Sequence, residues 1–152
     1  MRPTTLLFFA VILISGLTFS EPAVSEPIGG SDATAVDLDN FIATQQPTMP
    51  GTRTILPPGR VSFVAVLKSQ PELIKVQYLF EALAVMQIEP LPKVSHRIFV
   101  ESAEGTIIPV YVEDKAVPLI KDKVATESQA SFVGYHVYNY SKGPAIVVDS
   151  IN

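Results

Sequence analysis

The chain has 152 residues and a formal net charge of -4, and 47% of its residues are hydrophobic whereas 17% are charged. A chain of this length usually forms a single domain. It contains no cysteine, which excludes a disulfide scaffold, cysteine-ligated zinc and a thiol nucleophile. The slight excess of acidic residues argues against a broad phosphate-binding surface, so we expect no nucleic-acid partner.

The first 25 residues have the pattern of a secretory signal peptide. Arg2 precedes an apolar run at residues 6–17, and the small residues that signal peptidase prefers follow at 23–25. The apolar run is shorter than the roughly 20 residues that a bilayer-spanning helix needs. We therefore expect cleavage before Glu26, or alternatively after Ser20, and a periplasmic or secreted protein without a stable membrane anchor.

Residues 26–60 are interrupted by prolines and glycines, which predicts a linker. Within it, residues 37–46 carry apolar side chains at helical spacing behind acidic ones, which favours a short helix. The linker is either an arm that docks on a partner or a simple tether. Residues 61–152 are expected to form one globular domain.

The start of this domain can be interpreted in two ways. Residues 61–67 have the composition of a strand. Residues 69–72 resemble a capping box with proline in the first turn, and apolar residues follow at helical spacing, at Leu73, Val76, Phe80 and Leu83. Because residues 80–88 also alternate as in a strand, periodicity leaves both helix and strand open for residues 69–88.

A β-hairpin is predicted next, with strands at 96–102 and 106–113 and a turn at Gly105. Period-two alternation places one set of side chains toward the core, namely Ile98, Val100, Ile108, Val110 and Val112. The opposite set is expected to face outward, namely Arg97, Phe99, Glu101, Ile107, Pro109 and Tyr111.

The remaining chain predicts a short helix that starts between Asp114 and Pro118, followed by strands at 130–140 and 145–151. In the first of these strands, alternation separates two sets of residues. Phe132, His136, Tyr138 and Tyr140 share one face, and Val133, Tyr135 and Val137 share the other.

From residue 80 onward the predicted order is three strands, a helix and two strands, which resembles the OB fold, a five-stranded Greek-key barrel. Gly134 lies inside a predicted strand, where a small barrel must bend. The expected fold is therefore mainly β with one or two helices, a small OB-like barrel with an N-terminal extension. If residues 61–67 are the first strand and 69–86 a helix, the order becomes βαββαββ, a ferredoxin-like α+β fold with one added strand.

The sequence shows no catalytic or metal-binding motif, so we assign no catalytic residue, metal or cofactor. His96 and His136 are the only histidines, and two ligands do not make a zinc site. The carboxylates beside the hairpin, Glu101, Glu113 and Asp114, are interpreted as solvated strand ends.

The resemblance implies a contact face, because OB domains bind on the face of strands two and three. On this chain that face corresponds to Arg97, Phe99 and Tyr111. If Val133 and Val137 mark the core, Tyr138 and Tyr140 also face outward. Alternatively, residues 61–80 cover this face.

Two functions remain open. The first is an exported, soluble, non-catalytic binding or assembly module of the bacterial envelope, with an envelope protein or glycan as partner. The alternative is a small hydrolase that acts on envelope polymers. The absence of a nucleophile motif in the sequence favours the first.

Overall fold

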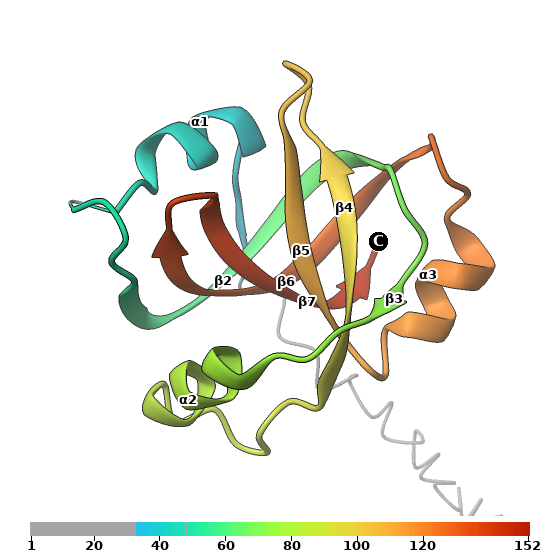
Figure 1. Cartoon of the computed structure of the whole chain (residues 1–152). Helices are drawn as coiled ribbons and strands as arrows, with labels where there is room; N and C mark the ends of the chain where they lie inside the picture. Colours follow the sequence, from blue (N-terminus) through green and yellow to red (C-terminus); the bar gives the residue numbers. More distant parts are fainter. Residues whose placement is uncertain (1–32, 48) are drawn as a thin grey trace, which may run out of the picture.

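The structure is a computed structural model that describes residues 33–47 and 49–152. The expected signal peptide at residues 1–25 lies outside the described residues. Within them the chain is mainly β, with seven strands in one sheet and three helices (Figure 1). In this part of the chain, no helix combines the length and the apolar character that a bilayer crossing requires.

The described chain begins with β1 (Thr34–Ala35), which pairs in parallel with β2 (Thr54–Leu67). Between them lies α1 (Leu38–Thr44), in the place where the sequence predicts a short helix. The N-cap residue Asp37 accepts a hydrogen bond of 2.8 Å from the backbone N–H of Asn40, which explains why the helix begins there. This segment packs on the sheet, and residues 54–60, which were expected in the linker, belong to β2.

Five strands account for most of the sheet, and each of them pairs with two of the other four. Besides β2 they are β4 (Val94–Glu101), β5 (Ile107–Glu113), β6 (Gln129–Tyr140) and β7 (Gly143–Ile151). Antiparallel pairs join β2 to β6, β6 to β7, β4 to β5, and the end of β2 to β4. Because β5 and β7 pair in parallel, the pairing runs through all five strands and returns to β2.

The β4–β5 hairpin confirms the prediction made from alternation. Arg97 lies opposite Tyr111, and Phe99 lies opposite Pro109. The side chains predicted to face the core are at most 2% exposed, namely Ile98, Val100, Ile108, Val110 and Val112. The other set faces outward and is partly or fully exposed.

Within residues 69–88 a helix forms, but it begins later than the capping box predicts. Glu72–Leu73 is a short strand, β3, which pairs with β4, and α2 (Gln77–Val85) follows. The proposed strand at 80–88 is therefore wrong, and so is the capping box. The side chain of Ser69 accepts a hydrogen bond from the Phe99 N–H, and Glu72 pairs with Arg97 instead of capping a helix.

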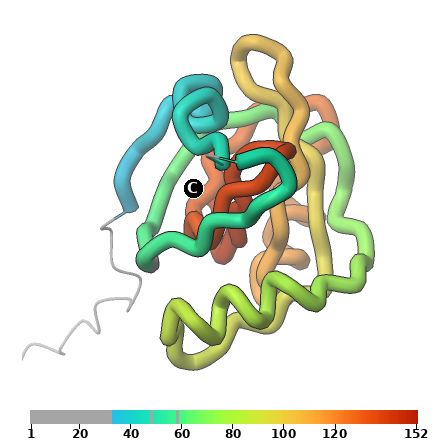
Figure 2. Tube along the Cα trace, turned by 60° about the vertical axis from the view of Figure 1, so that its left-hand side comes forward, coloured from blue at the N-terminus to red at the C-terminus, as the bar shows by residue number. Residues whose placement is uncertain are grey.

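Apolar residues fill two layers, one on each side of the sheet. The larger cluster lies between the inward faces of the strands and includes Phe63, Phe132 and side chains of α3 (Val117–Lys123), the predicted second helix. The second cluster lies under α2, whose buried stripe has helical spacing at Leu79, Ala82, Leu83 and Met86. In both views α1 and α2 lie at opposite ends of the molecule (Figure 2).

Strand β6 does not follow strict alternation. Its pairing with β7 shifts between Val133 and Gly134 and again between His136 and Tyr138. A β-bulge adds a residue and reverses the face of those that follow. As a result Val137 and Tyr138 both pack in the cluster under α2, so the predicted division of this strand into two faces is wrong beyond residue 136.

The ferredoxin-like alternative is contradicted by the strand directions, although its order of elements is observed. A βαβ unit joins two parallel strands through a crossover helix. Here β2 and β4, which flank α2 in the sequence, are antiparallel.

Candidate functional site

The outward side of the β4–β5 hairpin carries three of the residues predicted to form the contact face. The Arg97 guanidinium lies over the Phe99 ring, with its Cζ 4.9 Å from the ring centroid. Its Nε donates a hydrogen bond of 2.6 Å to a carboxylate oxygen of Glu72. Tyr111 is the cross-strand neighbour of Arg97, so the structure brings all three predicted residues together.

Tyr138 and Tyr140 join this group from β6. The hydroxyls of Tyr111 and Tyr138 are 3.1 Å apart and share a hydrogen bond. The Tyr138 and Tyr140 rings meet edge to face, with centroids 5.6 Å apart. Tyr138 is only 2% exposed, so the expectation that it faces outward is wrong, whereas Tyr111 and Tyr140 are half-buried.

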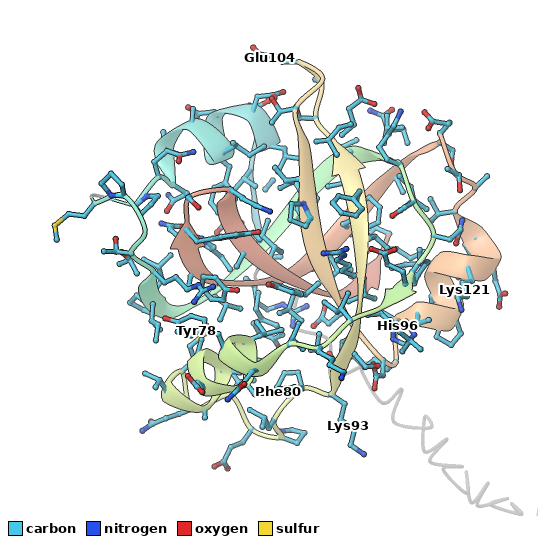
Figure 3. All side chains as sticks on the ribbon, viewed as in Figure 1. Tyr78, Phe80, Lys93, His96, Glu104 and Lys121 are labelled. Atoms are coloured by element: carbon cyan, nitrogen blue, oxygen red, sulfur yellow. The ribbon has the colours of Figure 1, made fainter. Side chains whose placement is uncertain are left out.

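Two further residues belong to the group and were missed by the sequence reasoning. Tyr78 on α2 meets the Tyr138 ring edge to face at 5.1 Å, and the Arg53 guanidinium lies 4.3 Å from the Tyr78 ring centroid. Figure 3 shows Tyr78 between α2 and the beginning of β2. No clear sequence pattern indicated either residue. Arg53 lies in the segment expected to be a linker, and the sequence left both helix and strand open for residues 69–88, which include Tyr78.

We call this group the tyrosine–arginine cluster. Its members come from the chain before β2 and from α2, β4, β5 and β6, and they are Arg53, Tyr78, Arg97, Phe99, Tyr111, Tyr138 and Tyr140. Helix α2 covers Tyr138. The alternative interpretation, in which residues 61–80 cover the contact face, therefore holds for this one residue. The other members remain at least partly accessible.

The phenols of Tyr138 and Tyr140 are neutral hydrogen-bonding groups at physiological pH. Burial raises the pKa of Tyr138 far above its usual range, and the hydrogen bond with Tyr111 raises it further. Burial, helped by Tyr111, also raises the pKa of Tyr140 to about 12, although Arg53 and Arg97 oppose the shift. The cluster therefore offers hydroxyl groups, ring surfaces and two guanidinium groups in one place.

Ser95, His96 and Asp114 form the only serine–histidine–aspartate group that the described hydrogen bonds bring together. In a hydrolase triad the serine and the carboxylate contact opposite nitrogens of the imidazole. Here Ser95 Oγ and Asp114 Oδ1 both lie next to His96 Nδ1, at 2.9 and 3.4 Å. The hydroxyl donates to Asp114 at 2.6 Å, and this bond lowers the pKa of the carboxyl group. The arrangement lacks the geometry of a triad.

The other carboxylates considered from the sequence have cationic partners. Glu101 lies 2.9 Å from Lys68 Nζ, and Glu113 lies 2.9 Å from Lys115 Nζ. Within residues 33–47 and 49–152, no three His, Cys, Asp or Glu side chains are grouped so that they could hold a metal ion.

His136 is buried beneath α1. Its ring meets that of Phe41 edge to face at 4.8 Å, and its Nε2 donates to Asn139 Oδ1 at 2.7 Å. The Asn139 amide in turn donates to Gln45 at 3.0 Å. Burial lowers the pKa of His136, and the bond to Asn139 opposes this only in part. The neutral ring is therefore the form that fits the folded protein.

This environment predicts a loss of stability in mild acid. Below the unfolded-state pKa of about 6.5, the unfolded chain binds a proton that folded His136 accepts only at lower pH. The unfolding free energy should therefore fall as the pH drops below that value, with a slope approaching about 1.4 kcal/mol per pH unit. Urea unfolding between about pH 5.5 and 7.5 measures the slope. The variant His136→Gln should reduce the slope of the unfolding free energy against pH. The control His96→Gln should retain the contribution of His136. Equal slopes in the parent and in His136→Gln would contradict the prediction.

Comparisons with protein-family models, with curated proteins and with solved structures find no match to this chain. Its function is therefore inferred from its own residues.

Proposed function

We propose that the chain is an exported, soluble, non-catalytic binding module of the bacterial envelope, built on an OB-like five-stranded barrel. The tyrosine–arginine cluster is its contact face. The pattern of residues 2–25 supports export. The strand pairing supports the barrel, because the five long strands pair in a ring and α3 lies between the third and fourth of them.

The observation that supports the binding role most is the convergence of rings, hydroxyls and guanidiniums from separate parts of the chain. Each guanidinium stacks on an aromatic ring, which restricts its motion before any ligand arrives. Contact sites that are organised in advance lose less entropy on binding. Aromatic and arginine side chains are also the ones that contribute most to recognition surfaces.

The test uses the isotope-labelled mature chain with soluble peptidoglycan fragments, neutral and acidic oligosaccharides, and peptides as probes. We expect at least one probe to shift the backbone amide signals of residues 97–99, 111 and 138–140. The variant Phe99→Ala/Tyr140→Ala should weaken that binding by at least about tenfold, as for aromatic contact residues. Because both side chains are half-exposed, the unfolding free energy should fall by no more than about 2 kcal/mol.

Leu119→Ala is the matched control, because Leu119 is exposed on α3, outside the cluster. This variant should bind like the parent. Binding that is unchanged in the double variant would show that the contact face lies elsewhere. A loss of stability well above that limit would show that these two rings serve the core.

A further inference from the structure

The charges of the cluster indicate what kind of ligand it accepts. We propose that the tyrosine–arginine cluster binds a polysaccharide with carboxylate groups, and that Arg53 and Arg97 hold these groups. This inference rests on the proposed function and specifies its ligand.

Arg53 is a cation held in place by a ring rather than neutralised by an acid. Its guanidinium stacks on Tyr78 at 4.3 Å, and among the described residues no carboxylate lies within ion-pair distance of it. A guanidinium stacked on a ring keeps its N–H groups at its edges, where they are free to donate. Such a group matches the two oxygens of a carboxylate.

Arg97 has a partner but keeps donors to spare. Its ion pair with Glu72 uses Nε, and no hydrogen bond within the described residues uses its Nη groups. Its side chain is 40% exposed, and the stack on Phe99 limits its orientation. Because Glu72 partly neutralises Arg97, we expect this arginine to bind anions more weakly in the parent protein than it would without Glu72.

The tyrosines connect the two arginines. A continuous series of contacts runs from Arg97 through its neighbour Tyr111 to Tyr138, then to Tyr78 and Arg53. Both guanidiniums are also near enough to Tyr140 to oppose the rise of its pKa. The tyrosine hydroxyls therefore belong to the same series of contacts as the two guanidinium groups.

This alternation of guanidinium and hydroxyl favours an acidic sugar over an acidic peptide. A uronic acid carries a carboxylate beside ring hydroxyls, and these can exchange hydrogen bonds with phenols such as those of Tyr111 and Tyr140. An acidic peptide carries carboxylates without neighbouring hydroxyl groups, so it cannot form these additional hydrogen bonds with the phenols. Because the chain as a whole has a net charge of -4, its overall field does not attract polyanions, and the local arginines must supply the binding energy.

Oligogalacturonate and its methyl ester make a matched pair of probes, since they differ in charge and share the sugar. Titration calorimetry and amide shifts of the mature chain would compare both with poly-glutamate. We expect oligogalacturonate to bind at the cluster and its methyl ester to bind at least tenfold more weakly. Added salt should weaken the binding, because the charged groups are partly exposed.

Substitutions test whether Arg53 and Arg97 bind the carboxylate groups of the ligand. Arg53→Gln and Arg97→Gln should each weaken the binding of oligogalacturonate by about five- to tenfold, in the range of a charge-assisted hydrogen bond. Lys121→Gln is the matched control, because Lys121 lies on α3, away from Tyr78 (Figure 3), and it should bind as the parent does. Glu72→Gln should strengthen binding several-fold by releasing Arg97, and this variant tests the proposal even if an arginine variant fails to fold.

The outcomes separate this inference from the proposed function. Equal binding of the methyl ester, or binding of poly-glutamate without binding of oligogalacturonate, would overturn the acidic-glycan ligand and leave a binding module in place. If no probe of the whole panel shifts the amides of the cluster, both the ligand and the contact face are overturned.

Discussion

Replacing Gly134 with alanine should prevent the protein from folding. A Cβ at this position would overlap the carbonyl oxygen of Val147 and lie 2.7 Å from its carbonyl carbon and 2.8 Å from the Cα of Val148. All three are backbone atoms of β7, which is paired on one side with β5 and on the other with β6. No side-chain rotation relieves the clash, so we expect the unfolding free energy to fall by more than about 4 kcal/mol.

Gly59→Ala provides the control for this prediction. It is also a glycine-to-alanine change, in β2, but the nearest atom to a Cβ there is the Pro57 carbonyl oxygen at 3.9 Å. Its unfolding free energy should change by no more than about 1 kcal/mol. Urea unfolding of both variants measures the difference, and a Gly134→Ala protein that unfolds near the parent's midpoint would show that β6 and β7 do not approach this closely.

A chain that ends at Gly143 should also fail to fold. The truncation removes the rest of β7, including Ile146, Val147 and Val148, which are fully buried. Each such side chain contributes roughly 1.5–3 kcal/mol when buried, against about 5–15 kcal/mol for the stability of a whole domain. The loss also leaves the backbone groups of β5 and β6 without partners along one edge each.

Circular dichroism and thermal melting of the truncated chain measure this effect. Removal of Asn152 alone, an exposed residue beyond the end of β7, is the matched control and should leave the melting temperature nearly unchanged. Cooperative melting of the shorter chain near the parent's temperature would show that β7 is peripheral to the sheet.

The candidate site was predictable on the hairpin and much less so elsewhere. Arg97, Phe99 and Tyr111 follow from alternation alone, because both strands pair without interruption along that stretch. Tyr138 was misplaced because a bulge lies just before it, and a bulge leaves no clear mark in a strand rich in aromatic residues. Arg53 and Tyr78 contact each other across 25 residues of chain, which no local pattern records.

The sequence by itself determined the elements whose signals are local. The short helix expected within residues 37–46 is α1, the β4–β5 hairpin buries the side chains that alternation predicts, and the internal glycine of β6 lies at a register shift, where another backbone approaches closely. In these cases the conformation depends on a few neighbouring residues, so propensity, spacing and turn chemistry agree.

Only the tertiary structure decided the state of residues 69–88 and the pairing of the strands. Both interpretations of that segment provide an apolar face, and the helix prevails because Leu79, Leu83 and Met86 fill a layer outside the sheet. Ser69 and Glu72 form their bonds to β4 rather than to a helix start, since a partner distant in sequence outcompetes a local cap. The observed order of elements is also that of the ferredoxin-like alternative, and the antiparallel contact of β2 with β4 contradicts that alternative, because strand direction is set by packing over the whole sheet.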